Sequence, residues 1–195
     1  MRWIVCVLAG AMVVGCHSTE AVCEEASMYA PSALVGTWKD DVFHAFEEGE
    51  ALSPVWGPQG GQHIWGAIRV TGLNPGDGEM VSDGGGIFGG GLEAGGLSTE
   101  AKGYDPLTLT FGIHYEDDLL EPTEFSFQAF LSGTPAQSTS PAQTVFVDPW
   151  ALKDSYPDQL HIESEMWVRA KDACGTDVED RRAFVIEQDE AYLEY

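Results

Sequence analysis

The sequence predicts an all-β domain built as a β-sandwich, and three observations lead to this fold class. Residues 107–115 and 160–170 alternate between apolar and polar side chains, the period-two pattern of strands with one buried face. Segments rich in glycine, proline, asparagine and aspartate separate such runs. Helical spacing is weak and short, at residues 20–28 and 189–195 alone. Several short strands with turn signals between them favour a sandwich, with a closed barrel as the alternative.

Eight segments are expected to be strands, because each combines strand-forming residues with flanking turn signals. They are residues 42–46, 51–56, 62–72, 107–115, 125–131, 144–147, 160–170 and 182–187. A stretch rich in serine, threonine, proline and glutamine, residues 132–143, is expected to form a long loop. The glycine-rich residues 84–96 lack the Lys-Ser/Thr pair of a phosphate loop and are expected to form a surface loop.

The alternation also predicts which side chains form the core. The expected inward residues are Ile64, Ile68, Val70, Leu107, Leu109, Phe111, Ile113, Tyr115, Phe125, Phe127, Ala129, Leu131, Leu160, Ile162, Met166, Val168 and Ala170. Residues 160–170 and 182–187, joined by a turn at 172–176, form the predicted closing hairpin. Its Val-x-Ala-x-Asp-x-Cys-Gly pattern at 168–175 resembles the end of an immunoglobulin-like or PKD-like domain, which implies an immunoglobulin-like β-sandwich.

The first residues have the pattern of an export signal. Arg2 supplies a positive charge, and residues 3–14 form an uncharged apolar run that is too short to span a bilayer as a helix. The run ends at Val13-Val14-Gly15-Cys16, which resembles the lipobox of bacterial lipoproteins. The resemblance implies cleavage before Cys16 and a diacylglycerol on its sulfur, and two or more acyl chains anchor a protein stably. The alternative is an ordinary secretory signal cut elsewhere.

This interpretation divides the chain into three parts. Residues 1–15 are the signal peptide, residues 16–32 a flexible lipid-anchored linker, and residues 33–195 the β-sandwich domain. His17 follows the lipidation site where an aspartate often retains lipoproteins at the inner membrane. The resemblance therefore implies a location in the bacterial cell envelope, at the outer membrane if the cell has one.

The chain is strongly acidic, with a net charge of −23. Removal of Arg2 with the signal leaves 8 basic against 32 acidic residues, a net charge of −24. Such a surface repels phosphate backbones, so nucleic-acid binding is not expected. The acids are spread in short groups, which is typical of a solvated exterior; binding of divalent cations is the alternative.

Four cysteines fall to two if Cys6 leaves with the signal and Cys16 is lipidated. An even pair in an oxidising compartment favours a disulfide between Cys23 and Cys174. Closing about 150 residues of chain stabilises a fold by roughly 4 to 5 kcal/mol in the chain-entropy model.

A second motif, Gly57-Pro58-Gln59-Gly60-Gly61-x-His63, precedes the long predicted strand. It resembles a motif of uncharacterised exported bacterial lipoproteins, a resemblance that carries no activity. Its glycines and proline predict a tight reversal, and His63 is expected to stabilise the loop by donating a hydrogen bond to its carbonyl groups.

Metal binding is the alternative role for the histidines and acids, and no cofactor is expected otherwise. A copper or zinc site would combine His63 with His44, His114 or His161, with Met80 or Met166 as a thioether ligand. Calcium would use oxygen ligands in loops, although no EF-hand spacing occurs. The acidic candidates are Asp77, Glu79, Asp83, Glu116, Asp117, Asp118, Asp172, Asp177 and Asp180.

The sequence gives no indication of an enzyme. It contains no Gly-x-Ser-x-Gly nucleophile elbow, and no pair of carboxylates is singled out by its neighbours. Trp65, Trp167 and Trp150 would form a platform for a sugar or a protein if they point outward. The alternative is that a sheet or loop covers them. The predicted function is therefore a lipid-anchored binding module with a protein or glycan partner, and a metal-binding envelope protein is the alternative.

Overall fold

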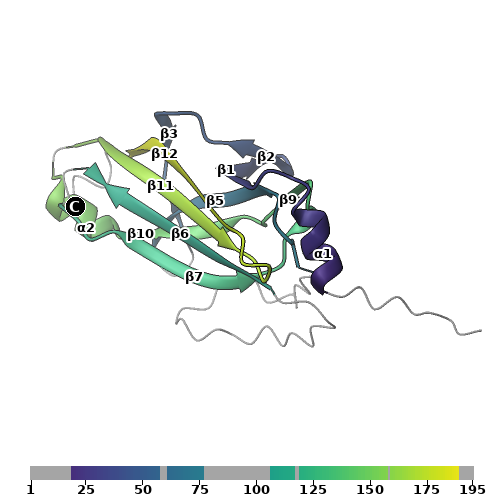
Figure 1. The fold of residues 1–195 in the computed structure, drawn as a ribbon. Helices are drawn as coiled ribbons and strands as arrows, with labels where there is room; N and C mark the ends of the chain where they lie inside the picture. Colours follow the sequence, from purple (N-terminus) through teal and green to yellow (C-terminus); the bar gives the residue numbers. More distant parts are fainter. Residues whose placement is uncertain (1–18, 58–60, 77–105, 117–118, 158, 189–195) are drawn as a thin grey trace, which may run out of the picture.

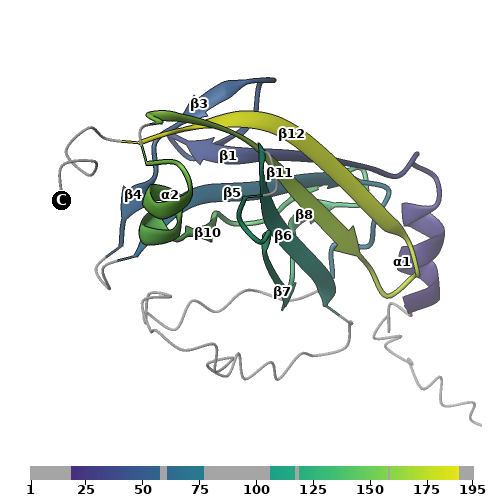
Figure 2. The same ribbon diagram turned by 90° about the vertical axis from the view of Figure 1, so that its left-hand side faces the viewer.

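The chain folds as two β-sheets packed face to face (Figures 1 and 2). The structure is a computed structural model that describes residues 19–57, 61–76, 106–116, 119–157 and 159–188. The described strands form two separate sheets and do not close into one barrel, so the predicted β-sandwich is confirmed. Helix α1 (Thr19–Ala26) lies at one end of the sandwich and helix α2 (Pro149–Ser155) at the other. Among the described helices, none has the length and apolarity to cross a membrane.

The seven-stranded sheet is built around one long central strand. Its strands are β1 (Ser32–Lys39), β2 (Val42–Ala45), β4 (Val55–Trp56), β5 (Gln62–Thr71), β8 (Ser132–Thr134), β9 (Gln137–Thr139) and β10 (Gln143–Val147). The main order is β2-β1-β5-β9-β8, and β4 and β10 pair with the first half of β5. The central strand β5 thus carries four partners along its length.

The five-stranded sheet holds the predicted closing hairpin. Its strands are β3 (Glu50–Leu52), β6 (Leu107–Tyr115), β7 (Thr123–Ala129), β11 (His161–Lys171) and β12 (Asp177–Glu187). They lie in the order β3-β12-β11-β6-β7, and all pairs are antiparallel except β3 with β12. The hairpin is confirmed, and β12 begins at Asp177, ahead of the predicted Arg182. The first part of β12 was not predicted because it is rich in charged residues, although Val178 in this part is buried.

The two inner faces form one core, as the alternation predicts. All five residues of β6 that were predicted to face the core are buried, as are the three predicted in β5. Of the five predicted at 160–170, four are buried. Phe125 and Phe127 are half-buried because β7 is an edge strand. Their ring centroids lie 5.8 and 6.1 Å from that of Phe111 and 5.7 Å from each other, in stacked arrangements. The backbone N–H of Val35 donates to the Asp180 carboxylate at 2.9 Å, which links β1 to β12.

Three predictions about the elements were wrong. Residues 51–56 are not one strand, because the chain leaves the five-stranded sheet after Leu52 and enters the other sheet at Val55. The expected loop 132–143 contains β8 and β9, whose small polar residues give no apolar alternation. Helix α2 was not expected; Asp148 caps its N-terminus by accepting hydrogen bonds from the N–H groups of Trp150 and Ala151.

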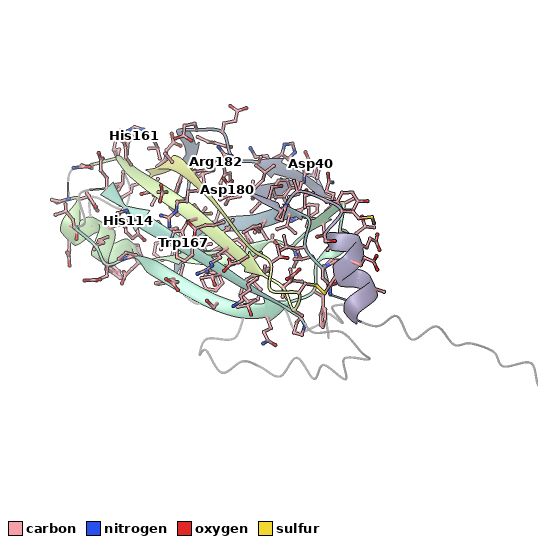
Figure 3. All side chains as sticks on the ribbon, in the orientation of Figure 1. Asp40, His114, His161, Trp167, Asp180 and Arg182 are labelled. Carbon is pink, nitrogen blue, oxygen red and sulfur yellow. A yellow bond between two sulfur atoms is a disulfide. The ribbon has the colours of Figure 1, made fainter. Side chains whose placement is uncertain are left out.

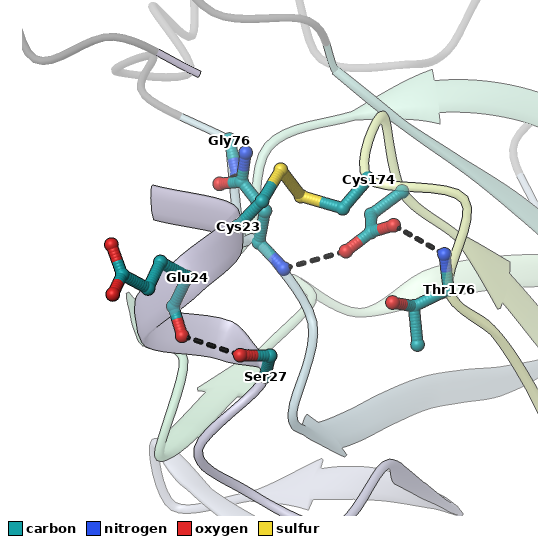
Figure 4. The surroundings of a disulfide bond; sticks show 8 residues. Cys23, Glu24, Ser27, Gly76, Cys174 and Thr176 are labelled. Atoms are coloured by element: carbon teal, nitrogen blue, oxygen red, sulfur yellow. Dashed lines mark hydrogen bonds between the residues drawn. A yellow bond between two sulfur atoms is a disulfide. The ribbon is translucent and has the colours of Figure 1, made fainter. Parts of the chain in front are cut away.

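The predicted disulfide joins α1 to the turn between β11 and β12 (Figure 4). Cys23 and Cys174 have a Cα–Cα distance of 5.6 Å. In the same turn, buried Asp172 accepts hydrogen bonds from the N–H groups of Asn74 and Thr176, each at 2.8 Å. Ala26 of α1 is buried as well. The described part of the predicted linker is therefore fixed to the domain by a covalent bond and by packing.

Candidate binding face

The glycine-rich motif connects β4 to β5. The backbone N–H of Gly57 donates to the carbonyl of Gly61 at 2.8 Å, and Val55 pairs with His63 across the two strands. The chain therefore reverses at the motif. Pro58, Gln59 and Gly60 lie outside the described residues.

His63 packs against its own motif and against the strand. The imidazole lies next to Gly57, and a Cβ atom placed on that glycine would be 3.4 Å from the ring. The ring centroids of His63 and Trp65 are 5.1 Å apart, and the two rings are nearly perpendicular. His63 makes no hydrogen bond to Gly57 or Gly61, the described ends of the loop. Burial lowers the pKa of His63 below 6.5, because the charged form loses solvation. The imidazole is therefore neutral at pH 7, with one donor and one acceptor nitrogen.

An exposed group of side chains surrounds His63 on the outer face of the seven-stranded sheet. The register places Val55, His63 and Phe146 side by side on β4, β5 and β10, while the neighbouring Val145 and Val147 point into the core. The exposed fractions are 41% for Val55, 40% for Trp65 and 50% for Phe146. We call these four residues, Val55, His63, Trp65 and Phe146, the aromatic patch.

Two further tryptophans are exposed close to the patch in sequence. Trp56 is the next residue of β4, with an exposed fraction of 41%, and Trp150 lies in the first turn of α2, directly after β10, with 65%. Among the described residues, five of the nine exposed large hydrophobic side chains come from β4, β5, β10 and the start of α2, although Trp56 points to the opposite side of β4 from Val55. Neighbouring exposed apolar side chains on a protein surface are typical of an interaction site.

The charge distribution separates the two sheets. No strand of the seven-stranded sheet contains an aspartate or a glutamate. Strands of the five-stranded sheet contain eight, namely Glu50, Glu124, Glu163, Glu165, Asp177, Glu179, Asp180 and Glu187. The aromatic patch therefore lies on the sheet that lacks the acids abundant elsewhere in the chain.

Both cations of the seven-stranded sheet already have partners. Lys39 forms an ion pair with Glu50 at 3.2 Å. The Arg69 guanidinium lies 4.2 Å from the centre of the Phe43 ring and donates to the Phe43 carbonyl at 3.3 Å. The strands of this sheet therefore present no cation without a partner, and its exposed acids, Asp40, Asp41 and Asp148, lie in the connections that follow β1 and β10.

The outer face of the five-stranded sheet has a different character (Figure 3). Trp167 lies against Gly112 of β6, where a side chain on that glycine would collide with the indole. Arg181 lies 5.9 Å from the Trp167 ring and pairs with Glu165 at 3.0 Å and Glu179 at 2.6 Å. A shallow hollow of about 370 Å³ lies beside them, lined by Glu48, Gly49, His114, Glu116, Glu163, Ser164, Glu165, Ala183, Phe184 and Val185.

The structure does not gather the predicted metal ligands. His63 lies on the seven-stranded sheet, whereas His114 and His161 lie on the other sheet. In the described ranges, no group of three or more histidines, cysteines, aspartates and glutamates is placed to hold a metal ion. Asp117, Asp118, Asp77, Glu79, Asp83 and Met80 lie outside the described residues, as does Cys16. Metal binding stays a prediction.

The predicted tryptophan platform is also divided. Trp65 and Trp167 lie on different sheets, so they do not form one surface. Val55 and Phe146, which complete the patch around Trp65 and His63, were not among the predicted site residues. A signal existed, because Phe146 stands between two valines in a predicted strand and alternation turns it outward.

Comparison with known proteins adds no relative: no family model matches the chain, and no curated protein matches it. The aromatic patch and the charge difference between the sheets are therefore the observations from which a function can be argued.

Proposed function

We propose that the protein is a lipid-anchored binding module of the bacterial cell envelope and that it binds its partner through the aromatic patch. The observation that carries the proposal is the exposure of Trp65, Phe146 and Val55 around His63, on a sheet without acidic residues. Exposed aromatic side chains of this kind supply contact area at low entropic cost when a partner covers them.

The envelope location is supported by the sequence and by the disulfide. Val13-Val14-Gly15-Cys16 has the form of a lipidation site, and it follows an export signal. A cystine between Cys23 and Cys174 suits an oxidising compartment outside the cytoplasm. Both features support the proposed location outside the cytoplasm.

The patch is suited to binding and not to catalysis. His63 is its single titratable group, and its lowered pKa leaves it neutral at pH 7. General acid–base chemistry would need a second group held within hydrogen-bond reach of a reacting atom. The remaining members of the patch, Val55, Trp65 and Phe146, offer apolar area.

Lipidation is tested by growing cells with a labelled fatty acid and comparing the full chain with the Cys16→Ser variant. We expect label on the full chain in the membrane fraction and none on the variant. A chain that stays in the cytosol with Cys16 unmodified contradicts the proposed anchor.

Binding is tested by sedimenting purified full-length protein with envelope fragments from the same cells. We expect the Trp65→Ala/Phe146→Ala double variant to lose most of its retention, because the exposed rings are removed. Trp167→Ala, which removes a tryptophan from the opposite face, serves as the matched control and should sediment like the unmodified protein. Thermal melting verifies that both variants are folded. Equal retention of the double variant and the unmodified chain would refute a role for the patch.

A further inference from the structure

The side chains of the aromatic patch are uncharged, and the acid that directly follows β10, Asp148, is engaged as the N-cap of α2. The strands that carry it contain no acid, and Arg69, the one cation on them, is occupied by Phe43. The chain as a whole has a net charge of −23, which repels polyanions at long range. Cationic ligands would instead be attracted to the acidic residues of the five-stranded sheet. An uncharged ligand is the class that this surface fits.

The patch combines apolar faces with a few hydrogen-bonding groups. Three strands contribute its row Val55, His63 and Phe146, which spans about 10 Å at the usual strand spacing. Phe146 reaches over Gly61, where a side chain would collide with its ring. Neutral His63 offers both a donor and an acceptor, and Thr144 lies beside Trp65 in the register. Such groups suit ligand hydroxyls, because a hydroxyl both donates and accepts hydrogen bonds.

The size and position of the patch bear on the kind of partner. A stable protein interface takes some 20–30 residues from each side, far more than four side chains provide, and a second copy would bring its own charge of −23. The patch also lies at the α2 end of the sandwich, whereas Gly72, at the other end of β5, contacts Tyr29 and Pro31 next to α1. Nine residues of strand separate His63 from Gly72, or about 30 Å.

We infer that the aromatic patch binds an uncharged glycan, with sugar rings packed on Trp65 and Phe146 and hydroxyl groups bonded to His63. The inference rests on the proposed function, since it names the ligand class of the same site. Aromatic faces attract the polarised C–H groups of a sugar ring, and the ring hydroxyls remain free for polar side chains. The patch lies at the α2 end of β5, about 30 Å along the strand from the residues next to α1, so a lipid on Cys16 near α1 would leave the patch accessible to a glycan of the envelope.

The test titrates full-length protein, in a detergent without sugar headgroups, with neutral hexamers of N-acetylglucosamine and of glucose. Calorimetry and saturation-transfer NMR report the binding. We expect saturable binding of at least one neutral hexamer, with affinity about tenfold or more weaker in Trp65→Ala and in Phe146→Ala. Trp167→Ala should bind as the unmodified chain does. Heparin, a polyanion, should not bind.

Three results would overturn the inference. One is the lack of binding of either neutral hexamer at millimolar concentration; another is binding that survives both patch variants. The third is concentration-dependent dimerisation that Phe146→Ala abolishes, which would assign the patch to a second copy. If envelope fragments still retain the protein through the patch while neither hexamer binds, the proposed function stands and the glycan assignment fails.

Discussion

At the scale of single residues, His63 links the sequence motif to the exposed face. Its neighbours on the sheet, Val55 and Phe146, and the edge-on Trp65 remove part of its hydration. This desolvation lowers the pKa of His63 from its ordinary value of 6.5. Because folding lowers this pKa, the neutral form is favoured in the folded state. The associated stability is present above pH 6.5 and is lost as the pH falls through the lower folded-state pKa.

We therefore predict that the His63 ring titrates below pH 6.5, as followed by NMR of the imidazole protons. Trp65→Ala should move the midpoint upward, toward 6.5, because the substitution readmits water to the ring. The effect on global stability should be small, since most of the ring remains solvated. Thr144→Ala on the neighbouring strand is the control and should leave the midpoint where it is. A midpoint at or above 6.5 in the unmodified chain contradicts the prediction.

At the scale of elements, alternation predicted the strands that have one apolar face, and it failed where polar residues form the strand. Residues 107–115 and 160–170 follow the period-two pattern, and their apolar positions face the core. Strands β8 and β9 contain serine, threonine, glutamine and glycine, so their pairing depends on neighbouring strands and not on local pattern. The switch of sheets between Leu52 and Val55 is likewise a property of the assembled sandwich.

The candidate site was predicted in the same partial way. The motif singled out His63, and the alternation placed Trp65 on the outward face. The pairing of β10 with β5, which brings Phe146 beside His63, joins segments some 80 residues apart. No local pattern specifies such a pairing. The distribution of acids between the sheets, in contrast, becomes visible as soon as the strands are assigned to their sheets.

The turn between β11 and β12 yields a prediction at the scale of elements. Asp172 is 6% exposed and accepts the N–H groups of Asn74 and Thr176. Replacement by alanine leaves two backbone donors without their acceptor, and each such loss costs about 1–3 kcal/mol. We expect Asp172→Ala to lower the free energy of unfolding by about 2–4 kcal/mol in urea titrations.

Asp148→Ala is the matched control for that substitution, because this aspartate also accepts two backbone N–H groups, but at the exposed start of α2. Loss of a helix cap there should cost about 1 kcal/mol. If the two variants are destabilised equally, burial of the Asp172 turn does not contribute as we describe.

At the scale of the whole molecule, the acidic residues of the strands lie on one sheet, and a disulfide joins α1 to the turn between β11 and β12. The five-stranded sheet displays the acids, which keep a surface hydrated and repel other acidic molecules. The seven-stranded sheet carries no acid and exposes aromatic rings. The division places the acids of the described strands on one sheet and the exposed rings of the proposed binding patch on the other.

The last prediction concerns the disulfide and its effects on the free energy of unfolding and on the distance between the lipid anchor and the domain. Cys23 and Cys174 are separated by 151 residues, so their bond removes about 4 to 5 kcal/mol of chain entropy from the unfolded state in the entropic model. The Cys23→Ser/Cys174→Ser variant should lose free energy of unfolding of that order in urea titrations, and Ser27→Ala, an exposed change in the same region, should lose almost none. An unchanged midpoint in the double variant would contradict this account.

The same variant changes the distance between a lipid on Cys16 and the sandwich. Cys16 precedes α1 (Thr19–Ala26) by three residues, and Cys23 lies four residues into the helix, so the anchor lies within about 17 Å of Cys23 while α1 is intact. Without the bond, α1 is held by packing alone, and its release would add the residues up to β1 to the tether. We expect the distance from the bilayer to a fluorophore on the domain, measured by energy transfer, to increase in the double variant and to stay constant in Ser27→Ala. If the distance is the same in the double variant and the unmodified chain, the bond does not limit the reach of the domain.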